Sequence, residues 1–571
     1  MTGILGTLLI TWVPLTRSFM TEDIRTSSMN LMQRSMLNQA EFENVEEHVL
    51  QHPHELARYR EYQNSLLLVN NLPTETLSEI LLATAYKAKR GTWTQGPLDW
   101  LGVTQVCRHW RAVALGCPLL WSELDFRCDP AFTDLMISRA GTAPLAILLG
   151  LSRRNPNLDT LFLYYQRFSV INIQYTAFQS EPFSAMHKIQ PSASLQRLII
   201  GGSYKDESKL LPTLAQTLSA CPNLTHLDIS CCPFYWNELP APPSLQYLRL
   251  HNPSRRTPTT LSWMGLRTAL ASMTALHVLD FEYILVPKDP QYPIQDSVSL
   301  PHLKELCLVD SDMSTVTNFL SNIQLPKTTK TFIHLDDGKW EPTDGIDPIV
   351  QVLSAFKASR SSHTTSAGAY VDQLWKIRVS ESRPRCRLTS MVKLWVDVNP
   401  ESKTLDNSPT LALGVPCDEL SAWKLVDAVK ATFDMSGVRS LSVSGLDGLG
   451  EHGWAAVTQL PKLETIHLLN TTLSHFGPLL CDQDSASQLS FPAIRNIIFE
   501  VINFEENKPF GVWFTKIVAA AMRRQKDHPL HKISLLHSRG FTVEDVEMLR
   551  KVVEVDWNGK ARRGWDLGHY D

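Results

Sequence analysis

A short apolar phrase recurs along most of the chain, and it constrains the fold more than any other feature. The phrase has the form apolar-x-x-apolar-x-apolar. It occurs as LQRLII (195–200), LTHLDI (224–229), LQYLRL (245–250), LHVLDF (276–281), LKELCL (303–308), MVKLWV (391–396), VRSLSV (438–443), LETIHL (463–468), IRNIIF (494–499) and, more weakly, LHKISL (530–535). Apolar residues at alternate positions are typical of a short strand with one buried face. We therefore expect many short, similar strands.

The spacing of these phrases indicates a repeat. The first five copies begin 29, 21, 31 and 27 residues apart, and more helical segments such as LLPTLAQTLSAC (210–221) separate them. This spacing resembles that of leucine-rich repeats, whose period is about 20–29 residues. The usual Asn or Cys after the phrase is not consistently present. The resemblance implies an α/β fold: an irregular leucine-rich-repeat solenoid with a curved, largely parallel sheet.

The repeat is interrupted between residues 309 and 390. LDDGKWEPTDGIDP (335–348) and KASRSSHTTSAGAY (357–370) are typical of long loops or an insertion. A chain of 571 residues would ordinarily hold about three or four domains, but a solenoid absorbs such a length as one elongated unit. We expect a helical extension at 1–64, a short helical module at 65–126, and a repeat domain at 127–571 with an irregular insertion at about 336–388.

The N-terminal segment carries an apolar run that does not match a membrane or secretion signal. The run from Ile4 to Leu15 is shorter than the roughly 20 residues of a membrane span, and Arg17 follows it instead of preceding it. Residues 20–65 then have apolar side chains at spacings of three and four, which predicts helix. We expect no membrane partner.

Charge and cysteine content argue against several classes of partner. The net charge is −4 without a long run of one sign, so we expect no nucleic-acid partner. The basic cluster SRPRCR (382–387) has no interleaved aromatic residues and is predicted to be a solvated loop. Ten cysteines without a CxxC pair argue against zinc and favour buried thiols in a reducing compartment, so we expect a cytoplasmic or nuclear protein.

No motif in the sequence predicts catalysis. DDGKWEPTDGID (336–347) lacks the order of a calcium loop, and GLDGLGEHG (445–453) lacks the residues of a phosphate loop or a dinucleotide fingerprint. His226, His277 and His467 lie inside the repeated phrases and are expected to be ordinary strand residues. We therefore predict a protein that is not an enzyme and has no catalytic residue, no metal site and no cofactor, although the sequence does not reveal carboxylates that pair in space.

The segment 66–121 has a different character from the repeats. In LLLVNNLPTETLSEILLATAYK (66–87), Pro73 suits the first turn of a helix, and Leu77, Ile80 and Leu81 share a face. A second helix is expected to begin between Leu98 and Val103 and to end at Gly116. Its predicted apolar face holds Val103, Val106, Cys107, Trp110 and Val113 or Ala114.

These residues carry a family resemblance. LPTETLSEIL (72–81) followed by VTQVCRHWRAVALGCPLLW (103–121) resembles an F-box, whose pattern combines Leu-Pro-x-Glu, an Ile-Leu pair, Val-Cys-Arg-x-Trp and a closing Pro-x-Leu-Trp. The likeness covers about fifty residues, and the joint at 87–100 is longer than in many F-boxes. The tail resembles, more loosely, the degenerate leucine-rich repeats that follow the F-box in many fungal members.

The resemblance implies a three-helix module that binds the small adaptor of a cullin–RING ubiquitin ligase and, through it, a cullin. The repeat domain would then bind an unknown protein target, which makes the chain a substrate receptor. The matching positions, and thus the expected adaptor-binding residues, are Leu72, Pro73, Leu77, Ile80, Leu81, Val106, Cys107, Trp110, Pro118, Leu120 and Trp121. Two short helices do not bury so many apolar groups between themselves, which also favours a partner surface. Two alternatives stay open: these helices dock against the repeat domain, or the chain is a non-catalytic binding scaffold without a ligase role.

Overall fold

A computed structural model describes 53–90, 99–125, 129–150, 163–174, 192–201, 218, 221–230, 242–251, 263–285, 297–310, 312–335, 345–361, 374–382, 389–396, 409–416, 421–445, 449–481, 490–504, 512–526 and 528–559. The apolar run at 4–15 and most of the SRPRCR cluster lie outside these residues. The chain divides into two compact units. Unit 1 is Met1–Ser122 with Ala131–Ala143, and unit 2 is Glu123–Pro130 with Pro144–Asp571.

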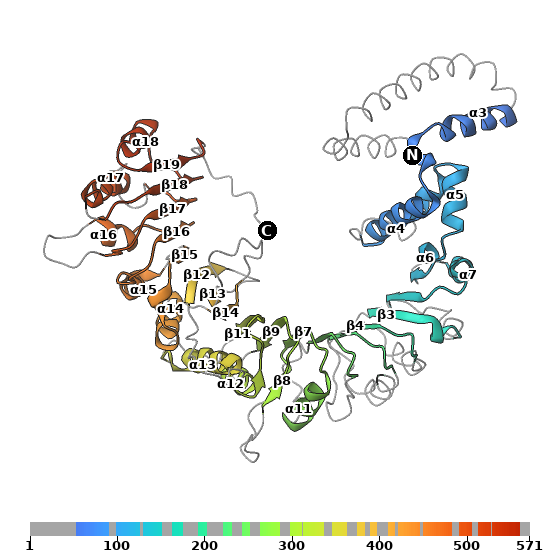
Figure 1. The fold of residues 1–571 in the computed structure, drawn as a ribbon, viewed down its shortest axis with the longest axis horizontal. Helices are drawn as coiled ribbons and strands as arrows, with labels where there is room; N and C mark the ends of the chain where they lie inside the picture. Colours follow the sequence, from blue (N-terminus) through green and yellow to red (C-terminus); the bar gives the residue numbers. More distant parts are fainter. Residues whose placement is uncertain are drawn as a thin grey trace. The chain divides into compact units, whose positions relative to one another are not determined.

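Unit 1 is helical. In chain order its elements are α3 (Pro53–Ser65), the 3₁₀-helix η1 (Leu68–Asn71), α4 (Thr74–Arg90), the 3₁₀-helix η2 (Asp99–Gln105), α5 (Arg108–Leu115), α6 (Pro118–Trp121) and α7 (Pro130–Ala140) (Figure 1). A small apolar core holds them together. Its residues include Leu77, Leu81, Trp100, Val113, Ala114, Leu120 and Trp121. Burying each Leu side chain contributes about 1.5–3 kcal/mol to the stability of the fold.

Within the described residues, unit 2 is built on a 17-stranded sheet. Strands β1 to β7, β9 and β11 follow one another side by side and are parallel. Their bounds are β1 (Glu123–Asp125), β2 (Leu145–Gly150), β3 (Phe168–Gln174), β4 (Arg197–Gly201), β5 (His226–Ser230), β6 (Tyr247–His251), β7 (Val278–Glu282), β9 (Glu305–Asp310) and β11 (Lys330–Leu335). A separate two-stranded sheet pairs β8 (Val298–Ser299) with β10 (Ile323–Gln324).

The strand order reverses in the middle of the large sheet. β11 pairs with β14 (Leu411–Pro416), β14 with β13 (Thr389–Val396), β13 with β12 (Leu374–Ser382), and β12 with β15 (Ser440–Ser444). β13 is antiparallel to both of its neighbours. Parallel order then resumes through β16 (Thr465–Leu469), β17 (Asn496–Glu500), β18 (Lys532–Leu536) and β19 (Glu554–Trp557).

The repeated phrases form strands, as expected. The ten phrases correspond to β4, β5, β6, β7, β9, β13, β15, β16, β17 and β18. Burial alternates along the strands: in β5, β6, β7, β16 and β17 the second and fourth residues are buried and the others are half-exposed. The sheet is thus largely parallel, with the exception that the phrase at 391–396 forms the antiparallel β13.

The buried side of the sheet packs against helices that lie along it (Figure 1). These are α11 (Trp263–Ser272), α12 (Met313–Ser321), α13 (Asp347–Ser361), α14 (Ser421–Thr432), α15 (Gly450–Val457), α16 (Phe476–Cys481), α17 (Val512–Arg524) and α18 (Val543–Arg550). The opposite side, which we call the open face, carries the half-exposed strand residues. The segment 336–388, expected as an insertion, contains α13 and β12. In the described part of the chain, no helix has the length and apolar character needed to cross a bilayer.

Candidate functional site

The expected adaptor-binding residues on α4 divide between core and surface. Leu77 and Leu81 are fully buried inside unit 1, whereas Leu72 and Ile80 are half-buried and Pro73 is exposed. Pro73 directly precedes α4, and its carbonyl accepts a hydrogen bond from the Leu77 amide at 3.0 Å. Leu77 and Leu81 therefore stabilise the module itself, and Pro73 is free to meet another surface.

The second helix begins later than expected. Cys107 has an extended backbone and is the N-cap of α5, where its Sγ accepts a hydrogen bond from the Trp110 amide at 3.5 Å. The expected continuous helical face through Val103, Val106 and Cys107 is therefore wrong. Because Val106 precedes the helix and does not lie on its apolar side, its side chain is 48 % exposed.

Asn70, which the sequence did not single out, connects the two halves of the module. Its Oδ1 accepts a hydrogen bond from Trp110 Nε1 at 2.6 Å and a weaker one from Cys107 Sγ at 3.9 Å. Its Nδ2 donates to the Asn64 carbonyl. One amide thus holds η1 against the start of α5 and fixes the half-buried Trp110 ring. The only hint of this role in the sequence is that two asparagines directly precede Leu72-Pro73.

The closing Pro-Leu-Leu-Trp forms α6, and most of it is core. Leu120 and Trp121 are 1 % exposed, while Pro118 is exposed. Trp121 Nε1 donates to the Ala114 carbonyl at 2.8 Å, its ring meets the Trp100 ring edge-on at 5.2 Å, and the Arg139 guanidinium lies 4.2 Å from its centre. Trp121 therefore joins α5, η2 and α7, which is a structural role.

An apolar surface remains on unit 1 after this core is formed. Leu68 and Val69 in η1 are exposed, and so is Val106. The contacts of Asn70 with Cys107 and Trp110 hold η1 beside the start of α5, so these three side chains lie at the same end of the module. Other exposed apolar residues in the described part of unit 1 are Tyr62, Leu66, Leu67, Leu115, Leu119 and Leu135. We call Leu68, Val69, Pro73 and Val106 the η1 surface.

The open face of unit 2 carries charged side chains that are largely paired in its first half. Arg249 on β6 lies between Asp280 on β7 (3.3 Å) and Asp228 on β5 (4.0 Å). Burial raises the pKa of both carboxyls, and Arg249 opposes that rise. Burial, aided by the neighbouring Asp280, also raises the pKa of the Cys307 thiol to about 12, which disfavours the reactive thiolate form.

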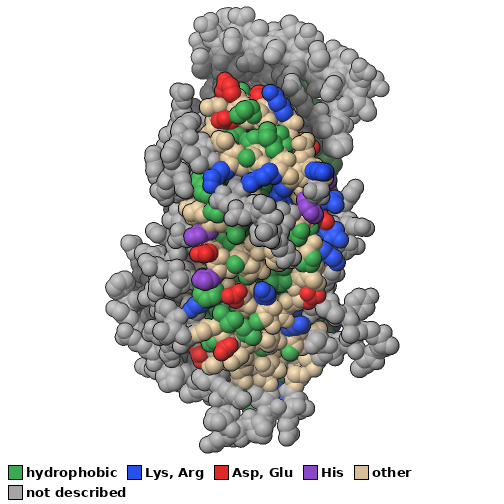
Figure 2. Space-filling model, turned by 90° about the vertical axis from the view of Figure 1, so that its left-hand side faces the viewer, with side chains coloured by type: hydrophobic (Ala, Val, Ile, Leu, Met, Phe, Trp, Pro, Cys, Tyr) green, Lys and Arg blue, Asp and Glu red, His purple; other side chains and the backbone are tan. Residues whose placement is uncertain are grey.

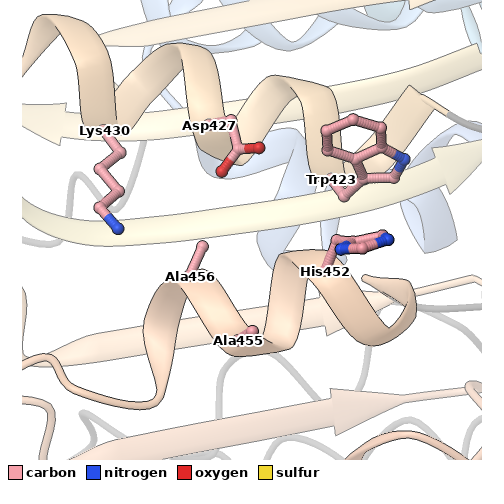
Figure 3. Close-up of a pocket in the computed structure, with 6 residues that line it drawn as sticks. All are labelled: Trp423, Asp427, Lys430, His452, Ala455 and Ala456. Atoms are coloured by element: carbon pink, nitrogen blue, oxygen red, sulfur yellow. The ribbon is translucent and has the colours of Figure 1, made fainter.

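A hollow on the helical side of unit 2 lacks the features of an active site. It has a volume of about 390 Å³ and lies between α14 and α15 (Figure 3). Trp423, Asp427 and Lys430 reach into it from α14, and His452 faces Trp423 from α15, with their ring centres 5.7 Å apart. The hollow is shallow and open, and no second carboxylate or nucleophile among the described residues lines it. Among the described side chains, no group of three His, Cys, Asp or Glu is placed to hold a metal.

Comparison with protein families supports one part of the chain. The family model described as F-box-like matches residues 69–127. The chain contains an F-box-like domain. The match runs from within η1 through α6 and over β1, and it includes the elements that Asn70 and Trp121 hold together. An F-box-like domain indicates a role in binding the small adaptor of cullin–RING ubiquitin ligases, and proteins with this domain are generally not catalytic. A search of curated proteins found no match to this chain.

Proposed function

We propose that this protein is the substrate-recognition subunit of a cullin–RING ubiquitin ligase. The F-box-like domain binds the small adaptor, and through it the cullin, while unit 2 binds a protein target for ubiquitin-dependent degradation. Such a subunit works by raising the local concentration of the target near the ubiquitin-loaded enzyme. It requires no catalytic residue of its own. Its place of work would be the cytoplasm or the nucleus.

The observation that carries this proposal is the η1 surface. Leu68 and Val106 are 61 % and 48 % exposed, although both lie next to the buried core of the F-box-like domain. Covering a Leu or Val side chain contributes about 1.5–3 kcal/mol. A partner that covers this surface would therefore gain several such contributions. Among the expected adaptor-binding residues, Pro73 and Val106 are the best placed for direct contact, and Leu77, Leu81, Leu120 and Trp121 act by holding the domain in shape.

Unit 2 is proposed to be a degenerate leucine-rich-repeat domain, as in many fungal proteins that carry an F-box. Its strands recur with one buried and one open face, and helices pack against the buried face. The residue after the strand has a positive φ at Tyr283, Asn470, Val501 and His537. The same backbone feature at four strand ends supports a structural repeat. The open face then offers side chains from many strands to one target.

Adaptor capture by the full-length chain tests the proposal. The variants Leu68→Asp and Val106→Asp each place a charge on the η1 surface, and each should weaken capture of the purified adaptor at least tenfold, because a buried carboxylate without a partner is costly. Both positions are exposed, so the domain should fold. Leu81→Asp would be a poorer choice, since Leu81 is fully buried and its loss would unfold the domain.

The control is Leu135→Asp, which introduces the same charge at an exposed position on α7 of the same unit. Adaptor capture should survive this change. If the wild-type chain fails to retain the adaptor, or if the two η1-surface variants retain it as well as wild type does, the proposal is wrong.

A further inference from the structure

Three basic side chains lie together on the open face where the strand order reverses. Lys376 and Arg378 are two residues apart on β12, so they point to the same face. Lys393 on β13 is the direct cross-strand partner of Arg378, which places their Cβ atoms about 5 Å apart. All three are half-buried. We call Lys376, Arg378 and Lys393 the basic triad.

Among the described side chains of β12 and β13, no carboxylate compensates the basic triad. Besides the triad, the described side chains at the open-face positions of β12 to β15 are small, hydroxyl-bearing or apolar: Ser380, Met391, Trp395, Ala412, Gly414, Ser440, Ser442 and Ser444. The nearest flanking strands bring Lys330, Phe332 and His334 on β11, and His467 on β16, whose imidazole is 2.8 Å from Glu500. In contrast, Arg249 in the first half lies between two carboxylates.

The repulsion among the three positive charges of the triad affects the pKa of its two lysines. Burial, together with the charge of Arg378, lowers the pKa of Lys376 and of Lys393. Both effects disfavour the charged ammonium, and no acidic group among the described residues opposes them. Like charges held close together at a half-buried position are unfavourable unless a ligand of opposite charge joins them.

Two polar groups beside the triad have no hydrogen-bond partner among the described residues. Arg378 Nε is buried and unpartnered. Ser442 is the register partner of Arg378 on β15, is only 4 % exposed, and its Oγ is unpartnered too. Arg378 Nε and Ser442 Oγ can both donate hydrogen bonds, so together they could bind an anion with several oxygen atoms.

The basic triad has an aromatic side chain on one side and small residues of β14 on the other. Lys376 Nζ lies 4.6 Å from the centre of the Trp395 ring, which keeps the ammonium at the ring face. On the other side of β13, Ala412 is the register partner of Lys393, and Gly414 is that of Met391. The β14 side of the triad is thus lined by short residues, which are themselves buried.

From this arrangement we infer that the basic triad and Ser442 form a binding site for a phosphoryl group. A phosphate monoester carries a charge of about −1.5 to −2 and three strong acceptor oxygens, which matches three cations and a hydroxyl, whereas a carboxylate offers one charge and two oxygens. The guanidinium supplies paired donors, and the two ammonium groups supply charge. The inference goes beyond the proposed ligase role and does not depend on it, because adaptor binding takes place on the other unit.

The surroundings of the triad differ from other charged parts of the molecule. Figure 2 views the side that carries α16, α17 and α18, where acidic and basic side chains are interspersed. Such a mixed surface is ordinary for a protein with a net charge of −4. The sequence 374–396, from β12 to β13, departs from it with six basic residues and one acidic residue. Three of those six are arginines outside the described residues, and they are not part of the site.

Calorimetric titration of the full-length chain tests the inference with four probes. These are inorganic phosphate, the blocked tripeptide Gly-phosphoserine-Gly, the same tripeptide with serine, and the same tripeptide with glutamate. Phosphate or the phosphorylated tripeptide should bind at least tenfold more tightly than the glutamate tripeptide, and the serine tripeptide should not bind. The tighter of the two phosphorylated probes identifies the source of the group as a free ion or a peptide side chain.

Charge-neutral variants locate the site. Arg378→Gln and Lys393→Gln should each weaken binding of the phosphorylated probe at least tenfold, and both should fold, because they relieve repulsion. Lys532→Gln on β18 is the matched control. It removes one positive charge from the same face, but from a lysine that already pairs with Glu554 and Asp556 at 3.2 and 3.4 Å. The Lys532→Gln variant should bind the phosphorylated probe as tightly as the wild-type chain does.

Three results would overturn the inference. The first is absence of binding of both phosphorylated probes to the wild-type chain. The second is equal weakening by Lys532→Gln and Arg378→Gln, since that would show attraction to overall charge only. The third is binding of the glutamate tripeptide as tightly as the phosphorylated one. Failure of adaptor capture would leave these outcomes unchanged, so the two proposals fail separately.

Discussion

His226 shows how one half-buried ring makes the stability of unit 2 depend on pH. Its imidazole stacks on the Tyr247 ring with centres 3.9 Å apart, and burial, assisted by the charge of Arg197, lowers its pKa to about 4. In the unfolded chain a histidine has a pKa near 6.5. Between these values the unfolded state binds a proton that the folded state does not, so stability falls as the pH decreases from about 6.5 towards 4.

The variant His226→Phe should remove this contribution, because phenylalanine keeps a stacking ring and cannot bind a proton. Urea unfolding at pH 7, 6 and 5 measures the effect. The variant should lose less stability between pH 7 and pH 5 than the wild-type chain does. An identical pH dependence in the two proteins would show that the imidazole stays accessible to protons in the folded state.

The F-box-like domain also shows how far single residues could be predicted from the sequence. Spacing correctly placed Leu77 and Leu81 on one apolar face, because that pattern depends only on helical period. It did not show that Trp121 is sealed within the domain, since its partners Trp100 and Arg139 come from other elements. Asn70 was missed for the same reason: its hydrogen bond to Trp110 joins residues 40 positions apart.

The residue that follows a strand adopts the same left-handed backbone conformation in several repeats, although its residue type differs from one repeat to the next. Asn470 follows β16 and Val501 follows β17, with φ of 46° and 57°, and each amide donates to the end of the next strand. Asparagine tolerates this left-handed region, whereas a β-branched residue is strained there. The conformation at Val501 is therefore set by the hydrogen bond to the Leu536 carbonyl, at 2.8 Å, against the preference of the side chain.

A reciprocal pair of substitutions tests this interpretation. Val501→Asn should stabilise the protein by about 1 kcal/mol, and Asn470→Val should destabilise it by about 1–2 kcal/mol, because αL strain is relieved in one case and introduced in the other. Val501 is partly exposed, so little packing is lost. Urea midpoints of the two variants measure the effects. Changes of the same sign in both would contradict the strain argument.

The elements of the sheet could be predicted better than their order. All ten phrases form strands, because alternate burial is local to each strand. The reversal at β12–β14 was not visible in the sequence, since MVKLWV has the same pattern as its parallel relatives although β13 is antiparallel. Pattern specifies which face of a strand is buried, and it leaves the direction of the strand open. The basic triad was missed for this reason, because Arg378 and Lys393 become neighbours only through that antiparallel pairing.

At the scale of the whole molecule, the two compact units separate the two proposed binding events. The η1 surface belongs to unit 1 and the basic triad to unit 2. Substitutions that share no contact partner usually act independently. Leu68→Asp should therefore weaken adaptor capture at least tenfold and leave phosphate affinity within twofold of wild type, while Arg378→Gln should do the reverse.

Both assays on the same preparations, with the double variant Leu68→Asp/Arg378→Gln, measure the coupling between the two binding events. The double variant should show both single losses without a further change. If either single variant lowers both activities, the units communicate, and the phosphoryl group would then control adaptor binding instead of acting on its own.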